Sequence, residues 1–415
     1  MLSELSHWCS LLLVAGLLSL APMPAIAQSE VRGPRGQVMP GIDVLAAEGF
    51  APLAGKRVGL ITNHTGLTRD HRAVIDVLFE APEVQLVALF APEHGIRGTE
   101  DSKVDSTQDE KTGLPIHSLY GQTRKPTPEM LTGIEVMVFD IQDIGTRFYT
   151  YISTMALAMQ AAQEQGIAFV VLDRPNPIGG VKVEGAVIPR HLSGGFTAIY
   201  PIPTRHGMTI GELARMFNTD FAIGVDLTVV PMRHYERWMH YDDTGLLWVN
   251  PSPNMKTLNG ALLYPGPGAA ETTTLSVGRG LDRPFEMYGA PFMDAQRVAA
   301  NLARRSTPGV RFVPCSFTPT APYHQFRNQL CHGVFAIVYD RDAMNSVQVG
   351  LHMVQAFYEE HPDDYRALGG FKTSSGDEEL WAKLTEQRMT PEEIMAGWQA
   401  DLDAFIARRA EYLLY

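Results

Sequence analysis

Short apolar segments rich in β-branched residues alternate with helix-like segments along the first half of the chain. The apolar segments are residues 57–63, 84–90, 136–141, 168–172 and 227–231. Segments with helical patterns lie between them, at residues 71–80, 150–165 and 209–218. Nearly continuous apolar strands separated by helices are typical of a parallel sheet covered on both faces. The alternation predicts an α/β fold, with a Rossmann-like parallel-sheet domain over residues 28–245.

Sequence signals at helix ends support this alternation. Gly166 follows the segment 150–165, and glycine commonly occupies the position after a helix. Thr209 precedes Glu212 by three residues, which is the spacing of a capping box at a helix start. Another helix start is expected at Thr390, which is followed by proline and two glutamates.

The character of the sequence changes between residues 245 and 295, where loops rich in proline and glycine predominate. Beyond them, residues 310–314 and 333–339 have strand patterns, and residues 346–360 and 391–414 have helical ones. We therefore expect a smaller α+β domain over residues 246–415, which completes the cleft of the first domain.

The N-terminal segment has the features of a secretion signal. Residues 10–22 form an apolar run that is too short for a stable membrane anchor, and Ala25-Ile26-Ala27 is a small-x-small cleavage pattern. We expect residues 1–27 to be removed as a signal peptide. No further run of 18 or more apolar residues follows. The sequence thus predicts an exported protein, periplasmic or secreted, without a membrane anchor after cleavage.

Composition excludes several classes of function. Lys and Arg total 34 against 46 for Asp and Glu, and the net charge is −12, so the chain offers little basic surface for nucleic acid. With 415 residues, 45% hydrophobic and 19% charged, the chain can bury a large core and is not a disordered protein. Three cysteines are too few for a disulfide scaffold. Cys315 and Cys331 remain after signal cleavage, either as a disulfide or as two thiols.

Polar side chains follow four successive strands of the expected sheet. In open parallel sheets, ligands bind outside the carboxyl ends of the strands. Asn63 and His64 follow the first strand, and after the second, third and fourth strands come Glu93, His94, Asp140, Asp143, Arg147, Asp173, Asn176 and Glu184. Loops elsewhere in the chain add His206, Asn250, Asn254 and Glu271. Turns alone account poorly for so many carboxylate, imidazole and amide groups at strand ends, so we predict one shared polar cleft.

The cleft lacks the sequence fingerprints of common cofactor and metal enzymes. There is no G-x-G-x-x-G frame around Gly266 or Gly278, no phosphate loop, no H-E-x-x-H helix and no G-x-S-x-G elbow. Four residues could hold a divalent metal without the spacing of a helical metal site, namely Glu93, His94, Asp140 and Asp173. We therefore expect neither cofactor nor metal. The remaining carboxylate, amide, tyrosine and arginine groups suit the binding of sugars and the protonation of glycosidic oxygens.

These motifs, in this order, resemble those of one enzyme family. They are Ala91-Pro-Glu93-His94-Gly95, Ser118-Leu-Tyr120-Gly121, residues 140–151, Asp173-Arg-Pro-Asn-Pro177, Glu184-Gly185, Arg205-His-Gly207 and residues 264–271. The family is that of the exo-β-N-acetylmuramidases, glycoside hydrolase family 171, formerly a domain of unknown function. The resemblance extends from about Gly41 to the end of the chain. It implies a Rossmann-like catalytic domain with a smaller C-terminal domain, and release of N-acetylmuramic acid from the non-reducing end of peptidoglycan fragments during cell-wall turnover and recycling.

Glycoside hydrolysis usually requires one protonated carboxyl group and a second carboxylate. Glu93 is the candidate acid, because partial burial after an apolar strand would raise its pKa. Glu184 is the candidate partner, and Asp140 and Asp173 compete for this second role. His94 either orients Glu93 or binds a hydroxyl group. The distance between the two carboxyl groups decides between retention and inversion, and the sequence leaves it open.

Further side chains are candidate substrate contacts. The lactyl carboxylate distinguishes a muramoyl sugar from glucosamine, and Arg147, or alternatively Arg205, could bind it through two parallel hydrogen bonds. A salt bridge of Arg147 with Asp140 or Asp143 is the alternative. Aromatic rings can cover the sugar face, and amide, imidazole and carboxylate groups can bind its hydroxyls. These candidates are Tyr120, Tyr149, Tyr151, Asn176, His206, Asn250, Asn254 and Glu271.

Two other classes of function remain open. An exported, non-catalytic cell-wall sugar-binding protein would use the same cleft without a carboxyl group of raised pKa. A metal-dependent peptidoglycan amidase or deacetylase would act on the same polymer and would lose activity on chelation. The stereochemical outcome and the oligomeric state are not predicted.

Overall fold

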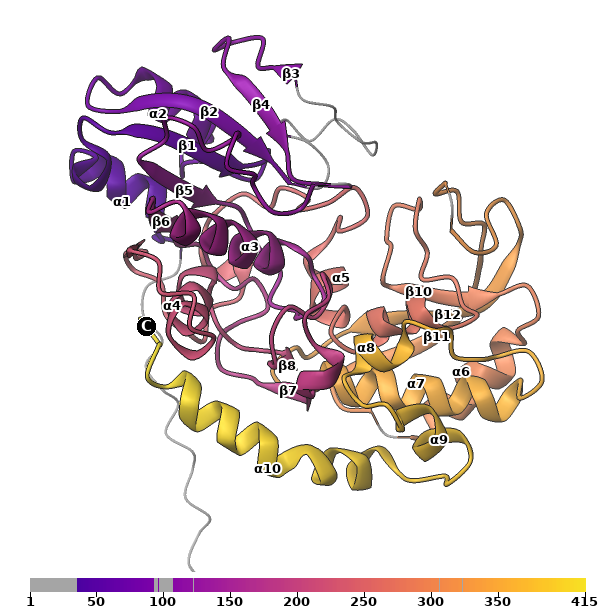
Figure 1. Ribbon diagram of the computed structural model, residues 1–415. Coiled ribbons are helices and arrows are strands. Elements are labelled where there is room, and N and C mark those ends of the chain that lie inside the picture. The colour runs from indigo at the N-terminus through magenta and orange to yellow at the C-terminus, as the bar shows by residue number, and fades with distance from the viewer. Residues whose placement is uncertain (1–35, 93–95, 97–106, 122, 306, 323) are drawn as a thin grey trace, which may run out of the picture. The chain divides into compact units, whose positions relative to one another are not determined.

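The largest sheet is formed by strands between residues 57 and 230. The computed structural model describes residues 36–92, 96, 107–121, 123–305, 307–322 and 324–415, so the expected signal peptide lies outside the described residues. The strand order is β3-β4-β2-β1-β5-β6-β9, in which six strands are parallel and β3 is an antiparallel edge (Figure 1). The strands are β1 (Arg57–Thr62), β2 (Gln85–Ala91), β3 (Thr107–Gln108), β4 (Pro115–Ser118), β5 (Val136–Asp140), β6 (Ala168–Leu172) and β9 (Leu227–Val230).

Helices cover both faces of this sheet, because its strands are apolar at almost every position. In β5, Val136 and Val138 pack with residues of α1 (Gly41–Ala47) and α2 (Val74–Glu80). Met137 and Phe139 belong instead to the core cluster that contains α3 (Tyr151–Glu164) and α4 (Ile210–Asp220). Successive side chains of a strand point to opposite faces, which explains the division into two layers. The predicted α/β fold with a Rossmann-like parallel sheet is confirmed.

A smaller antiparallel sheet and further helices make up the second half of the chain. Its strand order is β10-β12-β11, and helix α6 packs against β11 and β12. The strands are β10 (Met287–Ala290), β11 (Val310–Phe317) and β12 (Cys331–Val338). The helices are α5 (Leu258–Leu263), α6 (Ala295–Ala303), α7 (Ser346–Glu360), α8 (Phe371–Ser375), α9 (Leu380–Thr385) and α10 (Pro391–Arg409). The expected smaller α+β region is therefore present, while its boundary between residues 245 and 246 stays a prediction.

Several short elements lie between the larger ones. An antiparallel pair is formed by β7 (Glu184–Val187) and β8 (Pro203–Arg205). Four 3₁₀ segments lie at Ala51–Leu53, Arg190–Leu192, Tyr241–Asp243 and Pro267–Thr272. No helix among the described residues is long and apolar enough to cross a membrane.

The helix ends follow the sequence signals, with one exception. Thr209 and Thr390 form capping boxes with Glu212 and Glu393, and Gly166 has the left-handed φ of 67° that terminates a helix. Helix α10 ends at Arg409, earlier than the predicted residue 414. Beyond the helix, the carbonyl oxygens of residues 412 and 413 accept hydrogen bonds from the Arg215 guanidinium instead of from the helix backbone.

Cys315 and Cys331 are free thiols. Cys315 pairs with Gly333 across β11 and β12, and Cys331 pairs with Phe317, so the two cysteines are diagonal neighbours. Diagonal neighbours lie about 7–8 Å apart, beyond the usual Cα separation of a disulfide. The sequence left open whether these cysteines form a disulfide or stay as thiols, and in the structure they are thiols.

Candidate active site

The polar loops after β1 and β5 meet at the carboxyl edge of the parallel sheet. Asn63 Nδ2 donates to the Tyr151 hydroxyl at 3.0 Å, and this hydroxyl donates to the Pro251 carbonyl at 2.5 Å. The backbone N–H of Gln142 donates to Thr65 Oγ1 at 3.0 Å. Because β1 and β5 are parallel neighbours, their following loops leave the sheet side by side. Several of the loops that the sequence assigned to one edge therefore do lie together.

Asp143 faces His206 within this group of loops. His206 Nε2 lies 3.7 Å from Asp143 Oδ2, and His206 Nδ1 accepts a hydrogen bond from the Met208 N–H at 3.2 Å. Because Nδ1 is an acceptor, the ring proton of the neutral imidazole is on Nε2. Among the described residues, Asp143 Oδ1 and His206 Nε2 have no hydrogen-bond partner although both atoms are buried. Buried polar groups are normally paired, so these two atoms lack the compensation that buried polar groups usually have.

Three tyrosines form the aromatic part of the site. The Tyr149 ring contacts the rings of Tyr151 and Tyr264 edge-on, at centroid distances of 5.1 and 5.9 Å. Burial raises the pKa of the Tyr149 hydroxyl well above its usual value, and the nearby Tyr151 adds to this shift. The phenol therefore stays protonated and can donate a hydrogen bond. Tyr264 was part of a family motif in the sequence but was not among the candidate site residues.

Asp140 and Asp173 lie at strand ends as expected, but both are fully buried and bonded within the fold. Asp140 forms an ion pair with Arg174, with 2.9 Å between Asp140 Oδ2 and Nη2. Asp173 accepts hydrogen bonds from the Thr209 hydroxyl, the Gly211 N–H and the Tyr415 hydroxyl, at 2.8, 2.7 and 2.8 Å. Both carboxylates were expected to contact a ligand, but they lie inside the fold and accept hydrogen bonds from buried donors.

Glu184, the candidate partner of the catalytic acid, is also committed to contacts within the fold. Its side chain is buried, and its Oε1 accepts a hydrogen bond from Arg205 Nη1 at 2.8 Å. Its Oε2 accepts hydrogen bonds from the N–H groups of Ser346 and Val347, at 2.8 and 3.4 Å. These groups begin helix α7 and lack partners within the helix. The catalytic role of Glu184 stays a prediction, and the geometry is that of a helix-capping carboxylate.

Arg147 and Arg205, the two candidates for the lactyl carboxylate, are likewise enclosed. Arg147 is 0% exposed and donates to the carbonyl oxygens of Thr373 and Ser374, both at 2.8 Å. Burial lowers the pKa of Arg147 to about 9. Arg205 is 1% exposed and donates to Glu184 and to the carbonyl oxygen of Ile178. The alternative of a salt bridge between Arg147 and Asp140 or Asp143 is not what the structure shows, because Arg147 binds carbonyl groups instead.

The three candidate asparagines have different surroundings. Asn176 is buried in a turn, where Nδ2 donates to the Met208 carbonyl at 3.0 Å. Asn254 Oδ1 accepts a hydrogen bond from the Gly280 N–H at 2.8 Å. Asn250 is exposed, and its carbonyl oxygen lies 2.7 Å from His64 Nε2. Asn176 thus supports the loop fold, whereas Asn250 and Asn254 lie in the loop that contacts the β1 and Arg279 loops.

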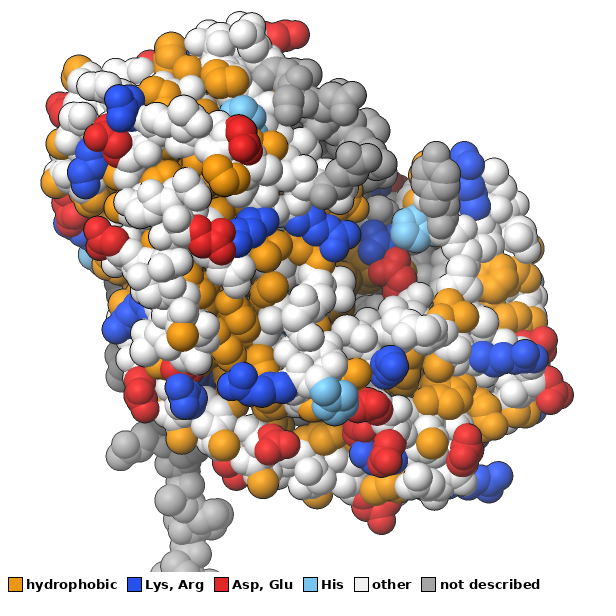
Figure 2. Space-filling view, in the orientation of Figure 1, with side chains coloured by type: hydrophobic (Ala, Val, Ile, Leu, Met, Phe, Trp, Pro, Cys, Tyr) orange, Lys and Arg blue, Asp and Glu red, His pale blue; other side chains and the backbone are white. Residues whose placement is uncertain are grey.

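Glu271, the last candidate contact, forms an ion pair with Arg279 on the wall of a cavity of about 160 Å³. His324 lines the same cavity, with Nδ1 3.6 Å from Glu271 Oε1. Figure 2 shows a hollow of the surface in which acidic, basic and histidine side chains meet. Sequence reasoning missed Arg279, since the run Gly278-Arg-Gly280 was considered only as a dinucleotide-binding loop.

The remaining predicted residues lie near the edge of what the structure describes. Glu93 and His94 lie outside the described residues; strand β2 ends at Ala91. Tyr120 follows β4 and is 36% exposed. Within the described ranges, no group of three or more His, Cys, Asp or Glu side chains is arranged to hold a metal ion.

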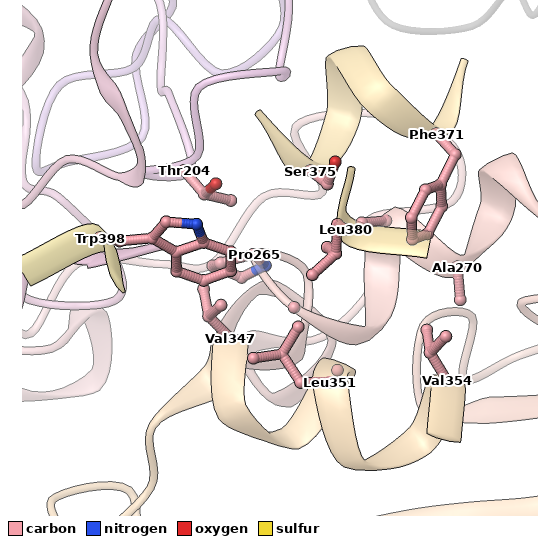
Figure 3. Close-up of a pocket in the computed structure, with 13 residues that line it drawn as sticks. Thr204, Pro265, Ala270, Val347, Leu351, Val354, Phe371, Ser375, Leu380 and Trp398 are labelled. Atoms are coloured by element: carbon pink, nitrogen blue, oxygen red, sulfur yellow. The ribbon is translucent and has the colours of Figure 1, made fainter. Parts of the chain in front are cut away.

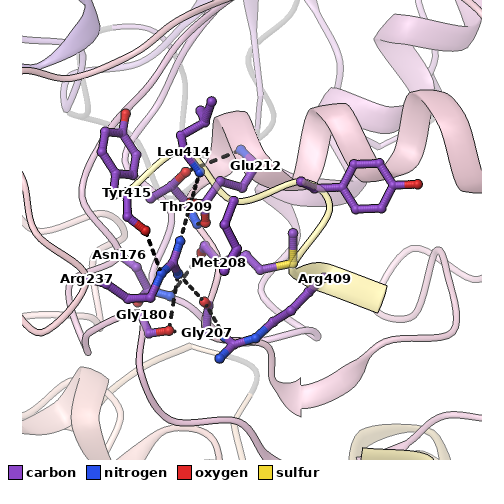
Figure 4. Close-up of polar contacts among 12 residues, drawn as sticks. Asn176, Gly180, Gly207, Met208, Thr209, Glu212, Arg237, Arg409, Leu414 and Tyr415 are labelled. Atoms are coloured by element: carbon purple, nitrogen blue, oxygen red, sulfur yellow. Dashed lines mark hydrogen bonds and ion pairs between the residues drawn. The ribbon is translucent and has the colours of Figure 1, made fainter. Parts of the chain in front are cut away.

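Two arginines hold the loop that carries His206, of which Arg409 is buried and Arg237 is partly exposed. Arg409 Nη1 donates to the carbonyl oxygens of His206 and Gly207 at 3.4 and 2.7 Å, and Arg237 Nη1 donates to the Gly207 carbonyl at 2.9 Å (Figure 4). Arg237 Nε also donates to the Tyr415 carbonyl at 3.1 Å. Gly207 has a φ of 60°, and a Cβ atom there would lie 2.4 Å from Arg409 Nη1, so only glycine suits this position. The C-terminal segment of the chain is thereby bonded to the His206 loop.

A second cavity is apolar and carries no chemistry. Trp398, Val347, Leu351 and Leu380 line it, with Thr204 and Ser375 at one side (Figure 3). It lies among α7, α8, α9, α10 and residues 265–270, and its mostly apolar lining offers few polar groups to a ligand.

Two family models match the chain. Residues 58–259 match the model described as Exo-beta-N-acetylmuramidase NamZ, N-terminal, and residues 262–415 match Exo-beta-N-acetylmuramidase NamZ, C-terminal. The chain is 47% identical over 384 residues to the peptidoglycan beta-N-acetylmuramidase NamZ of Bacillus subtilis strain 168. This alignment covers 91% of the chain and 92% of the relative.

Two solved structures have a similar fold. The crystal structure of a DUF1343 family protein from Bacteroides fragilis NCTC 9343 is 40% identical, with a TM-score of 0.84, and the match covers 92% of this chain and 100% of that one. A second DUF1343 family protein from the same organism is 32% identical, with a TM-score of 0.75, and covers 91% and 99% of the two chains.

Proposed function

The chain belongs to the exo-β-N-acetylmuramidase family and is a glycoside hydrolase, and we propose that it releases N-acetylmuramic acid from the non-reducing end of peptidoglycan fragments. The two family models carry this proposal, since together they account for residues 58–259 and 262–415. The polar edge of the parallel sheet supports it, because it offers carboxylate, imidazole and phenol groups to a sugar.

Glu93 is the proposed general acid. The glycosidic oxygen must receive a proton as its bond to the muramoyl carbon breaks, and a carboxyl group of raised pKa supplies it at neutral pH. Glu93 follows β2 within the family motif, two residues after the last strand position at Ala91. Its neighbour His94 is proposed to orient it.

Asp143 is our proposed second carboxylate, in place of Glu184, Asp140 and Asp173. The other three accept hydrogen bonds or form ion pairs on both carboxylate oxygens. Asp143 Oδ1 has no such partner among the described residues. A carboxylate in this position can stabilise the positive charge that develops on the sugar ring, or activate a nucleophile.

We also propose that the enzyme is exported and acts in the periplasm or outside the cell, in cell-wall turnover and recycling. The apolar run at residues 10–22 and the Ala25-Ile26-Ala27 pattern support this location. Cell fractionation and N-terminal sequencing test it, with Gln28 as the expected first residue of the exported chain.

A fluorogenic N-acetylmuramide tests the activity. We expect the wild-type enzyme to release N-acetylmuramic acid and Glu93→Gln to lose about 100-fold or more in kcat while still binding the sugar. Retained binding with no turnover by the wild type would favour the sugar-binding protein. Inactivation by EDTA, together with release of acetate or peptide, would favour the metal-dependent amidase or deacetylase.

A further inference from the structure

The lactyl carboxylate distinguishes a muramoyl sugar from glucosamine, yet neither arginine that the sequence assigned to it is open to a ligand. Arg147 and Arg205 are 0% and 1% exposed and donate to groups of the fold. An arginine that binds this carboxylate needs an edge of its guanidinium that faces a cavity.

Arg279 lines such a cavity. Its Nε and Nη2 atoms donate to the two carboxylate oxygens of Glu271, with 2.8 Å between Nη2 and Oε2. No described residue accepts a hydrogen bond from its Nη1, and the side chain is 21% exposed. Burial lowers the pKa of Arg279, but the Glu271 carboxylate outweighs this effect and raises it, so the guanidinium stays charged.

The cavity beside Arg279 has polar groups on its wall, together with Leu275 and Val277, and is large enough for a substituent of a sugar. Its volume of about 160 Å³ is several times that of one water molecule. Glu271, Ser276, His324 and Gln325 line it together with Arg279. These groups provide donors and acceptors around a charged ligand atom.

Arg279 is connected to the rest of the candidate site. Its guanidinium carbon lies 5.0 Å from the centroid of the Phe285 ring, and this ring contacts Tyr264 at 4.7 Å. Tyr264 in turn contacts Tyr149 at 5.9 Å. The next residue after Arg279, Gly280, donates its N–H to Asn254 Oδ1 at 2.8 Å. The cavity therefore lies beside the aromatic part of the site.

We propose that Arg279, held in place by Glu271, binds the lactyl carboxylate and so determines specificity for muramoyl over glucosaminyl sugars. The assignment rests on the proposed function. Arginine has five N–H donors, so one edge can pair with Glu271 while the Nη1 side pairs with a second carboxylate. The ion pair and the stacking on Phe285 fix the guanidinium plane before the substrate arrives, which lowers the entropy lost on binding.

Two matched substrates test the proposal: a fluorogenic N-acetylmuramide with a free lactyl acid, and its lactyl methyl ester, which lacks the charge. We expect the wild type to prefer the acid, and Arg279→Gln to lose about 10- to 100-fold in kcat/KM on the acid, mainly through KM, with little loss on the ester. Arg279→Lys should retain part of the preference, because it keeps the charge without the fork geometry. Arg283→Lys is the matched control, since Arg283 pairs with Glu286 and does not line the cavity.

Equal losses on acid and ester in Arg279→Gln, at unchanged thermal unfolding, would overturn the assignment and leave the proposed function intact. Absence of turnover of either muramide by the wild type would instead overturn the proposed function. In that case, calorimetric titration with N-acetylmuramic acid and its methyl ester tests whether Arg279 binds the lactyl carboxylate. Weaker binding of the acid alone to Arg279→Gln supports the assignment, and unchanged binding of the acid overturns it.

Discussion

His206 Nε2 lies 3.7 Å from Asp143 Oδ2, and both side chains are shielded from solvent. The two residues come from separate parts of the fold, since Asp143 follows β5 and His206 follows β8. A buried imidazole and a carboxylate at this distance interact more strongly than they would in water. Among the described residues, Asp143 Oδ1 and His206 Nε2 have no hydrogen-bond partner, so a sugar could contact them without breaking a bond of the fold.

Asp143→Asn should therefore affect the reaction more than the fold. We expect kcat on a fluorogenic muramide to fall about 100-fold or more, the range for loss of a catalytic carboxylate, while the midpoint of thermal unfolding changes little. His206→Gln should give a smaller loss of kcat. A kcat for Asp143→Asn within a few-fold of the wild-type value would show that Asp143 is not the second catalytic carboxylate.

Glu184→Gln should do the opposite and weaken the fold. The substitution removes the charge that compensates buried Arg205 and weakens the cap of α7, so we expect the free energy of unfolding in urea to fall by about 3 kcal/mol.

Glu135→Gln is a matched control for Glu184→Gln, because Glu135 and its partner Arg57 are 49% and 52% exposed. We expect its loss to be below about 1 kcal/mol. If Glu184→Gln retained wild-type stability but lost its turnover, Glu184 would be the catalytic partner after all.

The sequence was sufficient to predict the parallel sheet because its central strands are apolar at nearly every position. Strand β4 was missed because Pro115-Ile-His-Ser118 contains two polar residues and a proline. It therefore shows neither a continuous apolar run nor a clear alternation of apolar and polar residues. The pair β7–β8 was missed for a similar reason, since Glu184 and Arg205 at its ends are buried only because they neutralise each other.

The sequence predicts where the candidate site lies, but it does not predict the role of each residue there. Asp140, Asp173 and Glu184 have the residue type and strand-end position of site carboxylates, yet their partners lie 34, 36 and 21 positions away in the chain. Nothing local in the sequence indicates such pairs. Arg279 was overlooked because its significance comes from Glu271 and the cavity rather than from its flanking glycines.

Asp173 should make stability depend on pH in an unusual direction. Burial raises its pKa from 3.8 to about 7, and the Glu212 carboxylate adds to the shift. The folded state therefore binds this proton more tightly than the unfolded state does. The stabilisation is fully present below about pH 4 and is lost as the pH rises through 7.

Urea unfolding of the wild type and Asp173→Asn between pH 4 and 8 tests this linkage. We expect the unfolding free energy of the wild type relative to the variant to decrease from pH 4 to 7 and to level off above it. A difference that stays constant over this range would show that Asp173 is ionised in the fold at all of these pH values.

Arg409 should act as a positioning residue for the His206 loop. Its Nη1 donates to the carbonyl oxygens of Gly180, His206 and Gly207, so Arg409→Gln should leave some of these groups without a donor and let the loop move. We expect kcat on the muramide to fall about tenfold with a smaller change in KM, and Arg409→Lys to restore part of it. Arg408→Gln is the control, because the neighbouring Arg408 side chain is 58% exposed and pairs with Asp220 away from the loop. If both variants lowered kcat equally, or if Arg409→Gln lowered only the unfolding temperature, the C-terminal segment would stabilise the fold without positioning His206.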